Sequence, residues 1–93
     1  MAGYKLSEDA YSVLENIYEY SLLNFGEQTA DEYYLSLHQS FQLVADQPKL
    51  GREFHEFRRH EHRSHVFFYI ITDYGILIVN IYHQKENIDV KMQ

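Results

Sequence analysis

The sequence has 93 residues, of which 45% are hydrophobic and 16% aromatic, with no cysteine and a formal net charge of minus 6. This length predicts one domain spanning residues 1–93, and the apolar content suffices for a core without disulfides, as in a reducing cytoplasm. No apolar run approaches the roughly 20 residues of a membrane-spanning helix. The acidic balance excludes a broad phosphate-binding surface. We therefore expect a cytoplasmic protein that contacts neither a membrane nor, directly, nucleic acid.

The first half predicts a short strand followed by two helices. Residues 3–6 form the expected strand, and Ser7 is a good helix N-cap because acidic residues follow it in the first turn. Apolar residues at helical spacing then predict a helix to about Asn24. Gly26 is a natural residue after a helix end, and a second helical pattern stops before Pro48. A connection this short predicts an antiparallel αα-hairpin whose apolar stripes face one layer.

The second half predicts strands. One strand is expected over Phe54 to Arg59, and two β-branched and aromatic runs, 64–71 and 76–82, are joined by Asp73-Tyr74-Gly75 as a hairpin. Runs this apolar need cover on both faces, from the helices on one side and from more protein or a partner on the other. The expected fold is α+β, with a short N-terminal strand and an αα-hairpin packed on a small antiparallel sheet in the order β-α-α-β-β-β.

The charges divide the chain into two halves. The first 47 residues hold one cation, Lys5, against eight acids. All four arginines fall within twelve positions, and four of the six histidines lie within or just after this stretch: Arg52, Arg58, Arg59 and Arg63, with His55, His60, His62 and His65. A globally acidic protein can therefore present a local positive face.

The histidines allow more than one interpretation. The spacing of His60, His62 and His65 suits a transition metal, but no cysteine or firmly placed carboxylate completes a ligand set. A surface or partner-facing cluster is favoured, and a role in substrate handling is the second alternative. We expect no metal and no cofactor. His65 lies within a strand, where a hydrogen-bonded, half-buried imidazole is the expected state. His83, at a strand end, fits a structural and a functional role equally well.

The arginines and tyrosines also allow more than one interpretation. The arginines either pair with neighbouring glutamates or point to one side and meet a partner's carboxylates. Arg52 is expected to clamp the chain onto the second helix. Tyr69 and Tyr82 are expected to leave a hydroxyl at the surface. No G-x-S-x-G, P-loop or G-x-G-x-x-G motif occurs, which disfavours hydrolase and nucleotide-binding functions.

Five short stretches, in this order and spacing, resemble a known family over nearly the whole chain. They are Tyr4-Lys5-Leu6-Ser7, Phe25-Gly26-Glu27-Gln28-Thr29-Ala30, Gln47-Pro48-Lys49-Leu50-Gly51-Arg52, His65-Val66-Phe67-Phe68-Tyr69 and Ile81-Tyr82-His83-Gln84. The sequence resembles the ParE/RelE toxin superfamily, and specifically its ParE-like branch. The resemblance implies the toxin of a bacterial type II toxin–antitoxin module, held in a hetero-oligomer by a cognate antitoxin that wraps over it.

The resemblance also implies two candidate activities. ParE-like members poison DNA gyrase, whereas RelE-like relatives cleave messenger RNA on the ribosome with basic side chains and an acid or base. The strand position that carries an arginine in many relatives is Asn80 here, and Lys85 is the nearest match to their more basic tail. We therefore expect a non-catalytic inhibitor of gyrase that acts by protein contact. The alternatives are a ribosome-dependent mRNA endoribonuclease and a ParE-like toxin with a different target.

No residue is expected to be catalytic, and the predicted contacts fall in the strand half. The positive residues at the sheet edge and C-terminal segment are expected to bind the target, because the acidic helices offer little to a protein that handles DNA. These residues are Arg58, Arg63, His83 and Lys85. The apolar hairpin and its neighbouring arginine are expected to bind the antitoxin, because strands this hydrophobic are rarely left bare. The expected contacts are Arg59, Phe67, Tyr69, Ile78 and Tyr82.

Overall fold

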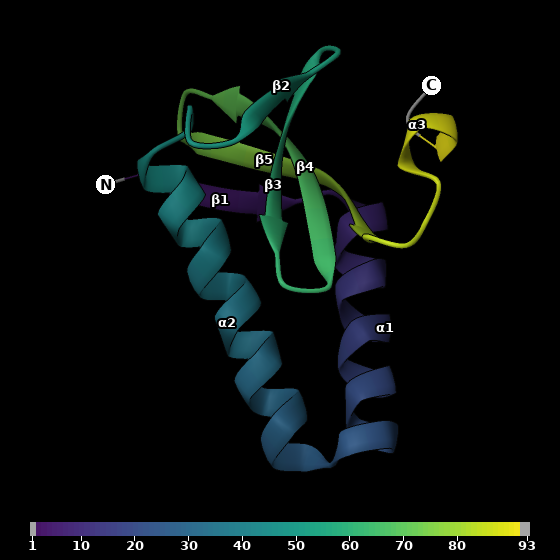
Figure 1. Cartoon of the computed structure of the whole chain (residues 1–93). Helices are drawn as coiled ribbons and strands as arrows, with labels where there is room; N and C mark the ends of the chain where they lie inside the picture. Colours follow the sequence, from purple (N-terminus) through teal and green to yellow (C-terminus); the bar gives the residue numbers. More distant parts are fainter. Residues whose placement is uncertain (1, 92–93) are drawn as a thin grey trace.

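Two long helices lie against one face of a five-stranded sheet in the computed structural model, which describes residues 2–91 (Figure 1). The elements are β1 (Gly3–Leu6), α1 (Glu8–Phe25), α2 (Glu27–Asp46), β2 (Arg52–Phe54), β3 (Phe57–His62), β4 (His65–Thr72), β5 (Gly75–His83) and α3 (Ile88–Lys91). The strands lie in the order β1-β5-β4-β3-β2. The predicted α+β class, with its N-terminal strand and αα-hairpin, is confirmed. No helix within residues 2–91 is long and apolar enough to cross a bilayer.

The sheet contains one more strand than the sequence indicated. The expected strand over 54–59 is two strands, β2 and β3, which pair from Arg52↔Arg59 to Phe54↔Phe57 around a turn. His55 turns the chain there with a φ of 55°, a left-handed conformation that histidine adopts more readily than most residues. Because neither glycine nor proline marks this turn, composition gave no sign of it. Strand β1 joins the other edge in parallel with β5, while the remaining pairs are antiparallel.

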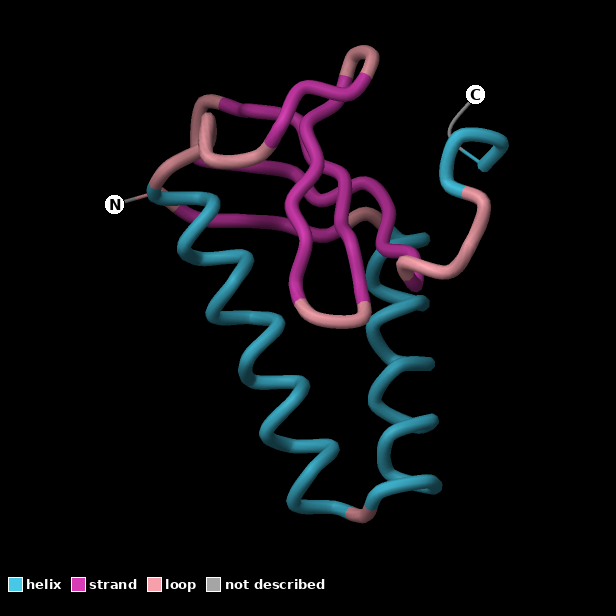
Figure 2. Tube along the Cα trace, in the orientation of Figure 1, coloured by secondary structure: helices cyan, strands magenta, loops and turns pink. Residues whose placement is uncertain are grey.

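The ends of the helices follow local capping rules. The Ser7 side chain accepts a hydrogen bond from the Ala10 amide at 3.0 Å and donates one to the Val79 carbonyl at 2.7 Å, so the cap also ties α1 to β5. Gly26, at φ 90°, separates α1 from α2, and its amide bonds the Leu22 carbonyl. The trace in Figure 2 shows that the resulting hairpin extends well past the turn that joins β3 to β4.

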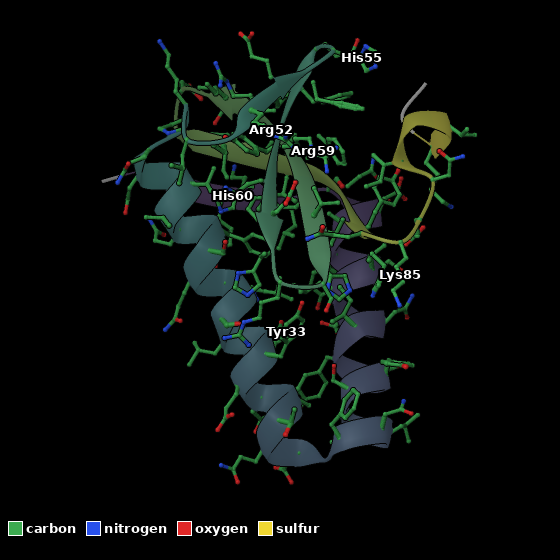
Figure 3. The ribbon with its side chains drawn as sticks, viewed as in Figure 1. Tyr33, Arg52, His55, Arg59, His60 and Lys85 are labelled. Carbon is green, nitrogen blue, oxygen red and sulfur yellow. The ribbon has the colours of Figure 1, made fainter. Side chains whose placement is uncertain are left out.

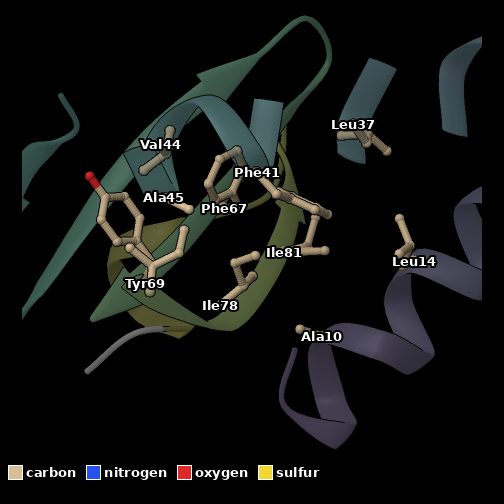
Figure 4. Close-up of a cluster of buried hydrophobic side chains, with 11 residues drawn as sticks. Ala10, Leu14, Leu37, Phe41, Val44, Ala45, Phe67, Tyr69, Ile78 and Ile81 are labelled. Atoms are coloured by element: carbon tan, nitrogen blue, oxygen red, sulfur yellow. The ribbon is translucent and has the colours of Figure 1, made fainter. Parts of the chain in front are cut away.

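The main core lies between this hairpin and the sheet (Figure 4). Phe41 of α2 meets Phe67 of β4 edge to face, with ring centroids 4.9 Å apart, and both side chains are fully buried. A second cluster lies on the opposite face, where Val66 and Phe68 pack with Ile88 of α3. The chain therefore covers part of both faces of its apolar hairpin itself.

Candidate functional site

The face of the sheet opposite α1 and α2, here named the open face, carries three of the seven polar side chains of β2 and β3, namely Arg52, Arg59 and Glu61. Residues paired across strands share a face. One row runs Arg52↔Arg59↔Phe68↔Asn80 and the next runs Glu61↔Val66↔Tyr82. Arg52 and Arg59 accordingly lie close together over this part of the sheet (Figure 3).

Arg59 is the most constrained cation of the open face. Its guanidinium carbon lies 5.6 Å from the ring centroid of Phe54 and 5.5 Å from that of Phe68, and its side chain is only 20% exposed. One carboxylate oxygen of Glu61 lies 3.5 Å from the Arg59 guanidinium and 2.9 Å from that of Arg52. Two guanidinium groups therefore share a single carboxylate.

The open face ends at Tyr82 and the C-terminal tail. The Tyr82 ring packs against Phe68 at 5.9 Å between centroids, and Lys91 of α3 lies 6.0 Å from the Tyr82 centroid. Partial burial raises the pKa of the Tyr82 hydroxyl. Lys91 forms an ion pair with Glu86 at 3.3 Å. The positive charge of this region is thus largely balanced by its own acids.

A second polar cluster lies between α2 and the sheet. His62, His65 and His83 occupy one cross-strand row. The Tyr33 hydroxyl and His65 Nδ1 form a 2.6 Å hydrogen bond, and Ser36 Oγ lies 2.9 Å from His62 Nε2. Desolvation, together with the neighbouring His83 and His62, lowers the pKa of His65 to about 4. The expectation that His65 is a hydrogen-bonded, half-buried histidine is confirmed.

A cavity of about 530 Å³ adjoins this histidine cluster, between the helical hairpin and the turn after β3. Its walls are mainly apolar and aromatic side chains of the helices, with Arg63, Ser64, His65 and His83 from the sheet. The guanidinium carbon of Arg63 lies 5.8 Å from the centroid of Tyr33. No group of three histidine or carboxylate side chains within residues 2–91 has a geometry that would hold a metal ion.

Three of the four predicted target contacts lie at the same end of the molecule. The Lys85 amide donates to His83 Nδ1 at 3.1 Å, and the Gln84 side chain donates to the Arg63 carbonyl. We name this group, Arg63, His83, Gln84 and Lys85, the basic corner. Arg58 lies apart, since five residues of extended chain, about 16 Å, separate it from Arg63.

Arg58 has a structural role at the other end of β3. Its guanidinium donates to the Gly51 carbonyl at 2.7 Å and lies 3.6 Å from Glu53. Arg58 therefore ties β3 to the loop before β2. The expectation for Arg52 is wrong, because that side chain crosses the open face to Glu61.

Three of the predicted antitoxin contacts are corrected by burial. Phe67, Tyr69 and Ile78 are 0% exposed because their side chains point toward the helices. The Tyr69 hydroxyl donates to the Pro48 carbonyl at 2.6 Å and accepts from the Gly51 amide at 2.9 Å, so the expected surface hydroxyl is also wrong there. Arg59 and Tyr82 do lie on the open face and are partly exposed.

Sequence reasoning missed the residues that position these groups. Glu61 was assigned only as a general partner for arginines, although the alternation Arg59-x-Glu61 on a strand places both side chains on one face. The platform of Phe54 and Phe68 depends on the unpredicted turn between β2 and β3. Tyr33 reaches His65 across 32 positions, a distance at which the sequence carries no local signal.

The comparisons with known proteins agree with the sequence resemblance. Residues 4–88 match the family model described as the ParE toxin of the type II toxin–antitoxin system parDE. The chain is 30% identical to Toxin ParE1 of Mycobacterium tuberculosis over 92% of its length and 93% of that protein. It is also 30% identical to Toxin ParE1 of Caulobacter vibrioides, covering 94% of both proteins.

A solved structure supports the same fold. The chromosomal ParDE toxin–antitoxin system from P. aeruginosa contains a chain that superposes with a TM-score of 0.73 at 18% identity, covering 89% of this chain and 96% of that one. The family match spans almost the entire domain, from β1 to the start of α3. The chain therefore belongs to the ParE family of toxins of type II toxin–antitoxin systems.

Proposed function

We propose that a cognate antitoxin neutralises this toxin by covering its open face, and that the free toxin inhibits DNA gyrase in the cytoplasm by protein contact. The observation that supports contact over RNA cleavage is the charge balance of the open face. Glu61 offsets one of two guanidinium charges, and Glu86 offsets that of Lys91. Cleavage of RNA requires cations available to the phosphate and an acid–base pair beside the 2′-hydroxyl.

The position of Asn80 supports the same choice. This residue lies on the open face opposite Phe68, at the strand position where the family resemblance places an arginine in many relatives. A neutral amide there lowers the positive potential that would attract RNA. The four histidines of β3, β4 and β5 lie in rows that face the helices, away from the open face. An imidazole base for the 2′-hydroxyl would therefore be on the wrong side of the sheet.

The basic corner is the surface that we assign to the target. Arg63 and Lys85 are exposed there and are held on adjacent segments, the turn after β3 and the segment after β5. The helical hairpin, in contrast, carries eight acids between Ser7 and Gln47 and no lysine or arginine. A target that handles DNA is better complemented by the basic corner than by these helices.

Supercoiling by purified gyrase in the presence of the toxin tests this proposal. The double variant Arg63→Glu/Lys85→Glu should weaken inhibition by at least about tenfold, because each change replaces an attraction by a repulsion at the interface. Lys49→Glu is a control for charge reversal elsewhere, since Lys49 is an exposed cation in the loop before β2, at the end of the sheet away from the basic corner. This variant should inhibit as well as the wild type.

Two outcomes would reject the proposal and separate the alternatives. Full supercoiling at a large excess of toxin, combined with growth arrest in cells, would indicate a different target. Codon-specific cuts in messenger RNA after induction, lost in the Arg59→Ala variant, would indicate a ribosome-dependent endoribonuclease.

A further inference from the structure

We infer that the open face contains a carboxylate-binding site centred on Arg59, and that its occupant is a glutamate or aspartate side chain of the antitoxin. The site comprises Arg52, Phe54, Arg59, Glu61 and Phe68. The identity of the occupant rests on the proposed function, in which an antitoxin covers this face. The existence of the site rests on its geometry alone.

The first argument is that Arg59 is already held in place. Its guanidinium carbon lies at nearly equal distances from the ring centroids of Phe54 and Phe68, 5.6 and 5.5 Å, and the two rings are 5.1 Å apart. Stacking of this kind removes most of the rotational freedom that an arginine must otherwise lose when it binds. A ligand would therefore meet a preorganised planar donor.

The second argument is a surplus of donors. Glu61 uses one oxygen atom for both Arg52 and Arg59, and the Nε–H of Arg59 is buried without a hydrogen-bond partner. A buried donor that is left unpaired lowers stability, so a ligand that satisfies it gains affinity. A carboxylate can accept from Nε and a terminal nitrogen together, which is the bidentate geometry that arginine favours.

The third argument concerns charge and size. The two guanidinium groups and the Glu61 carboxylate leave one net positive charge, which matches one carboxylate. A nucleic-acid backbone gains affinity from several neutralised phosphates in succession. A hollow of about 300 Å³ lies beside the site and is lined in part by Leu50, Arg52, Arg59 and Glu61. Its volume suits one side chain of a partner protein.

Glu61 then acts as an internal competitor for the incoming carboxylate. Its side chain is 48% exposed, so it can rotate toward water when a partner's carboxylate arrives. Removing its charge should strengthen binding, whereas loss of an ordinary contact residue would weaken it. Glu53→Gln is the matched control, because Glu53 lies on the same β2–β3 hairpin but pairs with Arg58, and its removal changes the net charge equally.

The test uses an oligoglutamate peptide as the probe and the Arg59 Nε–H resonance in a ¹⁵N correlation spectrum as the readout. Oligoglutamate should shift this resonance, bind the Glu61→Gln variant at least about threefold more tightly and bind Arg59→Lys about tenfold more weakly, since lysine lacks the bidentate fork. The Glu53→Gln variant should bind like the wild type. If oligoglutamate still shifts the Nε–H resonance of another arginine in the Arg59→Lys variant, the assignment of the site to Arg59 is overturned.

An oligouridylate of equal charge, at the same ionic strength, is the competing probe. A shift with oligouridylate and none with oligoglutamate would overturn the inference in favour of an RNA site, and no shift with either would also overturn it. An unchanged affinity of the Glu61→Gln variant for oligoglutamate would also overturn the inference, even if the toxin inhibits gyrase and binds its antitoxin. If the Glu61→Gln variant binds oligoglutamate more tightly but the toxin does not inhibit gyrase, the proposed target is rejected and the carboxylate-binding site is supported.

Discussion

Acidification should destabilise this protein through His65. The imidazole is bonded to Tyr33 of α2 and is flanked by His62 of β3, His83 of β5 and the carboxylate of Glu86. Its pKa is about 4 in the folded chain, against the ordinary histidine value of about 6.5 in the unfolded chain. The unfolded chain therefore binds a proton more readily between these two values. Stability is fully present above pH 6.5 and falls as the pH drops toward about 4.

The size of the effect follows from this difference in proton affinity. At about 1.36 kcal/mol per pKa unit, the full difference corresponds to about 3.4 kcal/mol. His65 is only half-buried, so water screens part of this, and we expect a loss of about 2 kcal/mol in the free energy of unfolding. Burial also lowers the pKa of His38, His60 and His62, and these groups act in the same direction.

A variant isolates the contribution of His65. His65→Asn retains an oxygen that can accept from the Tyr33 hydroxyl but cannot gain a proton. Urea unfolding followed by circular dichroism between pH 7.5 and pH 4.5 should show a shallower loss of stability in this variant than in the wild type. His55→Asn is the control, because His55 is exposed and asparagine tolerates its positive φ. Superimposable pH profiles of His65→Asn and the wild type would refute the reasoning.

Three further predictions concern the core, a buried hydroxyl and the sheet edge. Phe41→Ala should lower the free energy of unfolding by about 3–5 kcal/mol in urea titrations, whereas Leu23→Ala, at a side chain that is 86% exposed, should change it little; similar losses in both would contradict the assigned core. Tyr69→Phe should cost about 1–3 kcal/mol, because the buried Gly51 amide loses its acceptor; an unchanged midpoint would show that water replaces it. Gly75→Ala should speed amide exchange in β1, because Gly75 has a φ of 140° and an added Cβ would collide with the Gly3 backbone. Gly3→Ala is the control and should leave exchange unchanged, because open space surrounds the position of its Cβ.

The helical half of the fold could be predicted because its signals are local. The Ser7 cap and Gly26 set the helix ends within a few positions, and α1 ends at Phe25 where about Asn24 was expected. The strand half was harder to resolve. The turn at His55 has no glycine or proline, and the parallel pairing of β1 with β5 depends on contacts between distant segments.

The candidate site could be predicted by residue type more than by position. The concentration of arginine in 52–63 predicted a local positive face, because charge clustering is visible in composition, but the fold places Arg58 on the opposite face from Arg52 and Arg59. The face of the sheet on which each side chain lies could not be predicted, since β4 is apolar on both sides and its sequence does not show which residues point to the helices. Phe67 and Phe68 illustrate this, as neighbours that are buried in different clusters.

The pairing of β1 with β5 also has a consequence for how the toxin is made. Gly3 lies beside Gly75, so the first strand has no partner until β5 has been synthesised. The helices likewise pack on β5, and they emerge from the ribosome before it does. Contacts between segments so distant in sequence form late and slow the folding of a small domain. The nascent chain therefore passes through an interval in which its helices exist without the sheet that supports them, and neither the open face nor the basic corner is yet assembled.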